Sequence, residues 1–129
     1  MKIAVRYYSK LGNTQRIAQA IAEGAGTEAV SITAEPALTE PVDVLFLGGA
    51  PYANIMAPEL KAYAETLTPA LVGRVVLFTT SNWSRRTVLA LKKSLGEQGV
   101  AVDEDYFYAH MLNIAGRVEA AKEFGRNAV

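Results

Sequence analysis

Cysteine is absent from the 129-residue chain, and histidine occurs only once, at His110. The lack of cysteine excludes disulfides, thiol nucleophiles, cysteine-ligated zinc and iron–sulfur clusters. A single histidine cannot form a histidine-rich metal site, and we interpret His110 as a structural residue. We therefore expect neither thiol chemistry nor a metal centre.

Neither sign of charge is in excess, because 13 basic residues balance 13 acidic ones. A neutral chain offers no electrostatic footprint for a polyanion, which disfavours binding to DNA, RNA or a membrane surface. A long hydrophobic run is also missing, since the first apolar stretch ends at Arg6. That stretch fits neither a signal peptide nor a membrane span, so we expect a cytoplasmic protein.

Half of the residues are hydrophobic, which is enough to bury a core, and the length suits one domain over residues 1–129. Five apolar, β-branched runs predict strands over residues 2–8, 28–33, 43–47, 75–80 and 100–108. Apolar residues three or four apart predict helices over residues 14–23, 59–67, 86–96 and 114–124. The alternation favours a doubly wound α/β fold, a parallel sheet with helices on both faces.

Three loops, beginning at Ser9, Gly48 and Ser81, follow the first, third and fourth predicted strands. In doubly wound sheets, ligands bind outside the carboxyl ends of the strands, where the strand order reverses. We therefore expect these three loops to form the functional site.

The first loop joins a strand to a helix N-terminus, where backbone N–H groups and the helix dipole favour an anion. It consists of Ser9, Lys10, Leu11, Gly12, Asn13 and Thr14. The hydroxyls of Ser9 and Thr14 add donors, and Gly12 allows the backbone to close around a phosphate. The alternative is an ordinary turn in which Asn13 or Thr14 is the N-cap.

The other two loops each contain a large aromatic residue, Tyr52 and Trp83. At a sheet edge these side chains would be exposed unless a flat group, such as a planar cofactor ring, covers them. The alternative is that both pack on neighbouring helices.

Together these segments resemble the flavodoxin family. The family's phosphate loop has the pattern Ser/Thr-x-Thr-Gly-x-Thr, which residues 9–14 match except at Leu11. Residues 43–52 are similar to its third strand and first flavin loop, and residues 73–83 to its fourth strand and second flavin loop. The resemblance implies a flavodoxin-like five-stranded parallel sheet of order 2-1-3-4-5.

The resemblance also implies an electron-transfer protein that binds FMN without a covalent bond and shuttles single electrons between redox partner proteins, a reductase and an acceptor. The phosphate would bind the first loop. The flavin ring would contact the other two, at Ala50, Pro51, Tyr52, Ala53, Asn54, Thr80, Ser81, Asn82 and Trp83.

Two rival functions suit the same architecture. A phosphorylated receiver domain needs acidic residues at the ends of its first and third strands, but residues 7–9 and 48–50 contain none. A small FMN-dependent oxidoreductase acting directly on a quinone or porphyrinogen stays open. Arg85 and Arg86, at the start of a predicted helix, are interpreted as a solvated pair, with a partner or a nicotinamide phosphate as the alternative.

Overall fold

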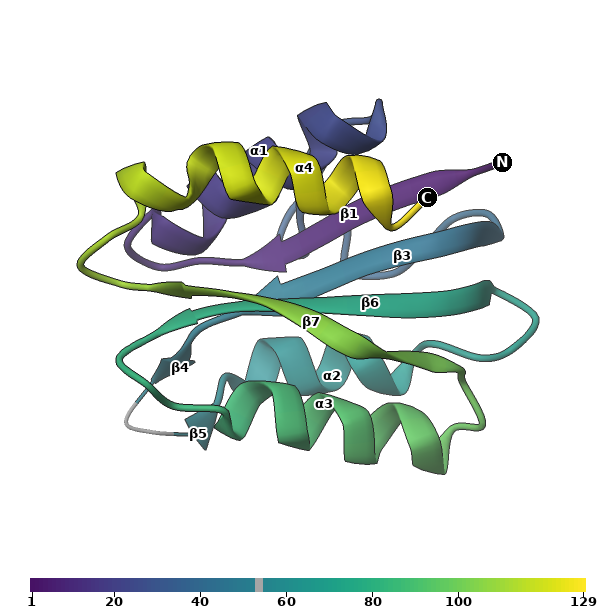
Figure 1. The fold of residues 1–129 in the computed structure, drawn as a ribbon. Coiled ribbons are helices and arrows are strands. Elements are labelled where there is room, and N and C mark those ends of the chain that lie inside the picture. Colours follow the sequence, from purple (N-terminus) through teal and green to yellow (C-terminus); the bar gives the residue numbers. More distant parts are fainter. Residues whose placement is uncertain (53–54) are drawn as a thin grey trace.

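A parallel sheet of five strands forms the centre of the molecule (Figure 1). The computed structural model describes residues 1–52 and 55–129, apart from the Tyr52 side chain. The strands of the sheet are β1 (Ile3–Tyr8), β2 (Ala29–Ser31), β3 (Val42–Gly49), β6 (Val72–Ser81) and β7 (Val102–His110). Their spatial order is β2-β1-β3-β6-β7, with every neighbouring pair parallel. The predicted order 2-1-3-4-5 is thereby confirmed.

Helices cover both faces of the sheet (Figure 1). On one face lie α1 (Asn13–Ala25) and α4 (Val118–Asn127), and on the other lie α2 (Pro58–Glu65) and α3 (Arg86–Glu97). A short 3-10 helix, η1 (Ala115–Arg117), precedes α4. The doubly wound arrangement is confirmed.

The sheet separates two hydrophobic cores, and β3 shows how its residues divide between them. Leu45 and Leu47 are fully buried on the α2 and α3 side. Val44 and Phe46 are buried on the α1 and α4 side. Because side chains of a strand point alternately to opposite faces, a strand covered on both sides is a continuous apolar run.

Three strands, β3, β6 and β7, extend further toward the carboxyl edge than the sequence predicts, whereas β2 ends two residues earlier. Gly48, expected to begin a loop, lies inside β3 and pairs with Phe78 on β6, where a Cβ would collide with the Phe78 ring. The last helix begins later than expected, since residues 115–117 form η1. A hairpin of β4 (Pro51–Tyr52) and β5 (Ile55–Met56) was not predicted, because two residues per strand give no alternating pattern.

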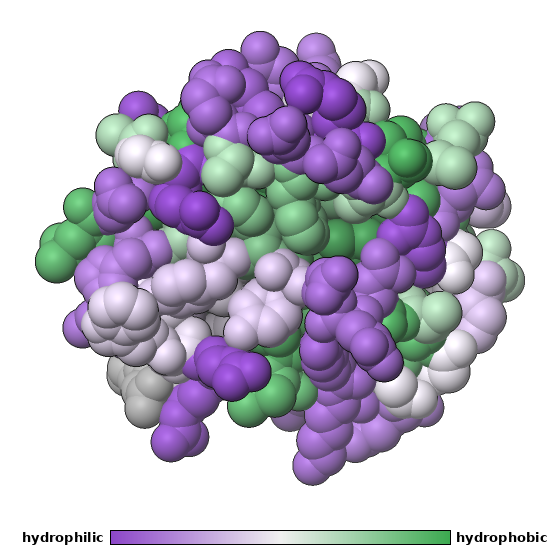
Figure 2. Space-filling view, viewed as in Figure 1, coloured by the Kyte–Doolittle hydropathy of each residue, from purple (hydrophilic) through white to green (hydrophobic). Residues whose placement is uncertain are grey.

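Figure 2 views the molecule from the same side and shows mainly hydrophilic residues over α4. Among the described residues, no helix is both long enough and apolar enough to cross a bilayer.

Candidate functional site

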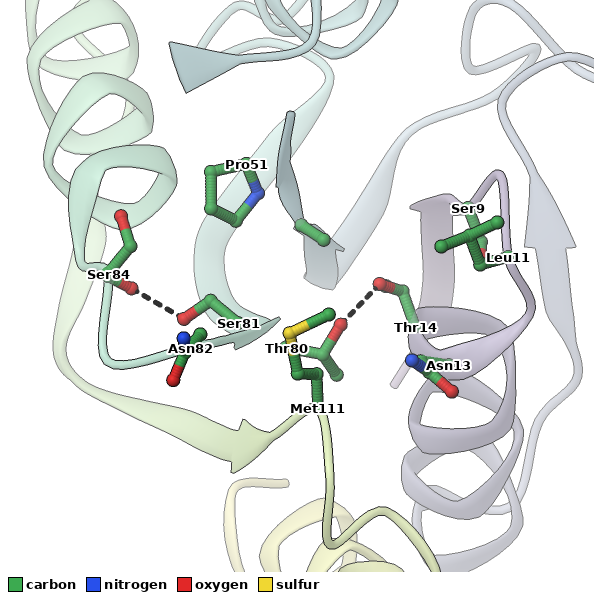
Figure 3. A pocket seen from close by; sticks show the side chains of 11 residues that line it. Ser9, Leu11, Asn13, Thr14, Pro51, Thr80, Ser81, Asn82, Ser84 and Met111 are labelled. Carbon is green, nitrogen blue, oxygen red and sulfur yellow. Dashed lines mark hydrogen bonds between the residues drawn. The ribbon is translucent and has the colours of Figure 1, made fainter. Parts of the chain in front are cut away.

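A cavity of about 340 Å³ lies at the carboxyl edge of the sheet, between the segments that leave β1, β3, β6 and β7 (Figure 3). Its volume falls at the low end of the roughly 300–1,000 Å³ of small-molecule sites. It is lined by Ser9, Leu11, Asn13, Thr14, Ala50, Pro51, Thr80, Ser81, Asn82, Ser84 and Met111.

The turn from β1 to α1 is built around Gly12, which is the N-cap of α1. Its backbone is left-handed, with φ 90°, and nothing lies within 4 Å of the position that a Cβ would take. Its N–H donates to Ser9 Oγ at 3.0 Å. No side chain caps the helix and the first turn holds no acidic residue, so a cap at Asn13 or Thr14 is wrong. The helix N-terminus thus faces the cavity with donors and without a competing carboxylate.

Two buried hydroxyls meet beneath the cavity. Thr14 Oγ1 on α1 and Thr80 Oγ1 on β6 lie 2.7 Å apart, and both residues are almost fully buried. Figure 3 shows the two side chains pointing toward each other, with Met111 beside them. Each hydroxyl has one proton, and the hydrogen bond between the two oxygens needs only one of them. The other proton is therefore available to a ligand.

The turn from β6 to α3 contains Trp83, which has a left-handed φ of 68° and is 76% exposed. The backbone N–H of Trp83 donates to the Tyr108 hydroxyl at 2.8 Å, and that hydroxyl donates to the Ser81 carbonyl at 3.1 Å. The Trp83 and Tyr108 rings stack at 6.3 Å. Trp83 therefore lies against β7, and the alternative that it packs on a helix is wrong.

His110, at the end of β7, supports the same turn. Its Nδ1 accepts the Leu112 N–H at 3.1 Å, so Nε2 bears the proton that is donated to Asn82 Oδ1 at 2.9 Å. Its ring meets Trp83 edge-on at 4.8 Å. The structural role assigned to His110 thus has a specific form, which is to hold the Asn82 and Trp83 turn.

Behind the first loop, the last residue of β1 contacts the first turn of α2. Tyr8 Oη donates to Glu59 Oε2 at 2.5 Å. This hydrogen bond, together with one from the Glu59 backbone, holds the pKa of Glu59 below its ordinary value of 4.5.

Most of the predicted site residues meet at this cavity. Lys10, Gly12 and Trp83 do not line the cavity, although Trp83 stands between the lining residues Asn82 and Ser84 in the sequence. Ala53, Asn54 and the side chain of Tyr52 lie outside the described residues, and the assignment of all these residues to cofactor binding stays a prediction.

Sequence reasoning missed Ser84 and Met111 in the lining, and Tyr108 as a support. One signal was present, because Tyr106, Tyr108 and His110 alternate along the last strand, which ends at the same edge of the sheet. The described residues contain no group of three potential metal ligands.

No protein-family model and no curated protein matches the sequence. Solved structures do match. An archaeal flavodoxin superposes with a TM-score of 0.75 at 17% identity, covering 98% of this chain and 95% of its own. A Fusobacterium nucleatum flavodoxin bound to flavin mononucleotide gives 0.70 at 14% identity, covering 99% and 96%. Rubredoxin oxygen:oxidoreductase from Desulfovibrio gigas gives 0.73 at 13% identity, and there the match covers 98% of this chain but 35% of that one. These similarities show that the chain has a flavodoxin-like fold.

Proposed function

We propose that this protein binds FMN in the cavity at the carboxyl edge and transfers electrons between two redox partner proteins. The observation that carries the proposal is that one cavity borders both the N-terminus of α1 and the turn that contains the exposed Trp83, through Asn82 and Ser84 on either side of it. The flavodoxin from Fusobacterium nucleatum, which has a similar fold, binds flavin mononucleotide, and this supports the choice of cofactor. A cytoplasmic location stays a prediction.

The residues present fit a phosphate at the first loop. No atom lies within 4 Å of the position that a Cβ of Gly12 would take, and no side chain caps the backbone N–H groups at the start of α1. The spare hydroxyl proton of the Thr14 and Thr80 pair adds a donor from the cavity floor. A dianion in this position would also meet the positive end of the α1 dipole.

The residues present also fit a flat ring beside the second and third loops. Pro51 and Met111 give the cavity an apolar wall, while Asn82 and Ser84 offer polar groups. Trp83 would shield one side of such a ring from water. Bound FMN supplies one- and two-electron redox chemistry, and the chain sets its environment through stacking, charge and hydrogen bonds.

The test is a titration of the apoprotein with FMN and, separately, with riboflavin, followed by flavin fluorescence. FMN should bind and be quenched, and riboflavin should bind much more weakly because it lacks the phosphate. Trp83 is the only tryptophan, so its emission should fall as FMN binds. Failure to bind FMN would refute the proposal, and equal affinity for riboflavin would refute the phosphate assignment.

Steady-state turnover distinguishes an electron carrier from an enzyme. With FMN bound and a chemical reductant present, a carrier should reduce protein acceptors. Saturable, rapid turnover of a quinone without any protein acceptor would instead favour the oxidoreductase alternative.

A further inference from the structure

Exposed hydrophobic side chains are concentrated at one edge of the molecule. We define the carboxyl rim as residues 9–16, 50–52, 55–61, 81–89 and 110–119, which lie at or after the carboxyl ends of β1, β3, β6 and β7. Eight large hydrophobic side chains are exposed among the described residues, and two of them are the chain ends, Met1 and Val129. The other six all belong to the carboxyl rim: Leu11, Ile55, Trp83, Leu89, Met111 and Leu112.

The neutral net charge of the chain conceals a separation of charge. The carboxyl rim contains two acidic residues, Glu59 and Glu119, and six basic ones, Lys10, Arg16, Lys61, Arg85, Arg86 and Arg117. The rim therefore has four positive charges in excess, and the remainder of the chain has four negative charges in excess. Three consecutive acidic residues, Asp103, Glu104 and Asp105, lie near the start of β7, at the opposite end of the sheet.

Arg85 and Arg86 of the rim differ from four basic residues elsewhere in the chain in having no carboxylate partner among the described residues. Lys2, Arg6, Arg74 and Lys122 each form a salt bridge with a carboxylate. Arg85 and Arg86 are exposed and form no salt bridge with any described residue. Arg85 Nε donates instead to the Tyr106 hydroxyl at 3.0 Å, which holds its guanidinium against β7.

We infer that the carboxyl rim docks a redox partner protein whose own contact surface is acidic. The inference rests on the proposed function, because it places the partner over the cofactor cavity. A bound FMN phosphate, at about −1.5 to −2 charge, offsets only part of the excess, so the rim stays basic. Tryptophan, methionine and arginine are the residues enriched in protein interfaces, and all three are exposed here.

The physical role of this charge is to guide encounter and orientation. Opposite potentials on two surfaces raise the association rate and fix the docking geometry. Because the opposite end of the molecule is acidic, an acidic partner is repelled there and attracted at the rim. This brings the partner to the side where the cavity opens.

The test is a nuclear magnetic resonance titration of the isotope-labelled protein, with and without FMN, using zinc-substituted rubredoxin as the probe. That probe is small, acidic and redox-inactive, so binding is measured without turnover. Shifts should concentrate in the carboxyl rim. Affinity should fall several-fold as salt rises from about 20 to about 200 mM, because screening shortens from roughly 20 to 7 Å.

Two matched pairs on α3 separate a local effect from a net-charge effect. Arg85→Gln with Arg86→Gln should weaken binding about three- to tenfold, the loss expected for two exposed ion pairs. Lys92→Gln with Lys93→Gln removes the same charge further along the helix and should change binding less than twofold. Equal losses in the two pairs, or shifts centred on α1 and α4, would refute the inference.

Two further probes complete the test. Hen lysozyme, a basic protein, should bind more weakly than rubredoxin, and tighter binding would refute the inference. A single-stranded oligonucleotide that bound the rim more tightly than rubredoxin would also refute it, in favour of a nucleic-acid surface. FMN affinity is measured on the same samples. If the wild-type protein does not bind FMN, the proposed function is refuted. If it binds FMN but does not bind rubredoxin at the carboxyl rim, this inference alone is refuted.

Discussion

The turns after β1 and β6 border the same cavity, but their conformations are stabilised in different ways. Each contains one residue with a left-handed backbone, Gly12 at φ 90° and Trp83 at φ 68°. Glycine adopts this conformation without a steric penalty, whereas a residue with a Cβ pays roughly 1–2 kcal/mol. The first turn is therefore specified by its own residues. The second needs support from elsewhere in the chain.

That support comes from β7, the strand beside β6. Tyr108 accepts the Trp83 N–H, and His110 donates to Asn82. Within the turn, Ser81 Oγ donates to the Ser84 carbonyl at 2.7 Å. These bonds explain how a tryptophan is held in a strained conformation at an exposed position. A locally encoded turn and a turn held by a neighbouring strand should respond differently to mutation.

The largest effect is expected for Gly12→Val. A β-branched residue at this φ is strained and would fill the open space proposed for the phosphate. We expect FMN affinity to fall about 100-fold, the loss of a hydrogen bond to a charged group, and stability to fall by roughly 1–2 kcal/mol. Titration by fluorescence and urea unfolding measure the two quantities.

Gly26 is the matched control, because it ends the same helix with φ 80° and has nothing within 4 Å of its Cβ position. Gly26→Val should cost comparable stability and leave FMN affinity unchanged. If both variants weaken FMN binding equally, the effect of Gly12 comes from the stability of α1 and the phosphate assignment fails.

The next effect concerns the hydroxyl pair under the cavity. Thr14→Val leaves the buried Thr80 hydroxyl without its partner, which should cost about 1–3 kcal/mol of stability. FMN affinity should fall about tenfold. Adding Thr80→Val should cost less than the sum of the single changes, because no hydroxyl is then left unpaired. Urea unfolding of the four proteins gives the coupling.

Thr87→Val provides the control, since the Thr87 hydroxyl is buried and has no partner among the described residues. Removing it should be neutral or stabilising. A loss of stability there as large as that of Thr14→Val would mean that the hydroxyl pair has no special role.

The fold was predictable from the sequence because parallel strands buried on both faces are continuous apolar runs. Val44 to Leu47 are all buried, and their run needs no knowledge of partners. Strand ends were less predictable. Gly48 is a glycine because the ring of Phe78 on β6 leaves no room for a Cβ, a contact between strands that are distant in sequence.

The site was predictable where local residues determine it and not where β7 contributes. The turn at Gly12 follows from a glycine between hydroxyl residues. The roles of Tyr108 and His110 depend on register, since they pair with Thr79 and Ser81 across the sheet. Composition was misleading in one respect, because a net charge of zero did not reveal a basic rim.

A smaller effect is expected for Tyr108→Phe. It removes the hydroxyl that accepts the Trp83 N–H, so the left-handed turn loses about 1 kcal/mol of support. The backbone coupling constant of Trp83 should move away from its left-handed value, and its emission should change. Stability is measured by urea unfolding.

Tyr106→Phe is the control on the same strand, since its hydroxyl accepts a hydrogen bond from Arg85 in an exposed setting. We expect a change of stability below about 0.5 kcal/mol and no change in the Trp83 coupling constant. If the two tyrosine variants behave alike, the Trp83 turn does not depend on the Tyr108 hydroxyl. The proposed difference between the turns after β1 and β6 would then be wrong.

The smallest effect is a dependence on pH that belongs to the first turn. Tyr8 donates to Glu59, which lowers the pKa of that carboxyl below 4.5 in the folded protein. The unfolded chain therefore takes up the proton at higher pH than the folded one. This contribution to stability is present above pH 4.5 and is lost as the pH falls through the lowered pKa.

Tyr8→Phe and Glu59→Gln should each make the acid limb of the stability profile shallower, and the double variant should add nothing further. Urea unfolding at about pH 6 and about pH 3 measures the slopes. Additive changes would show that the two residues act separately and that the base of the first turn has no acid-sensitive contact.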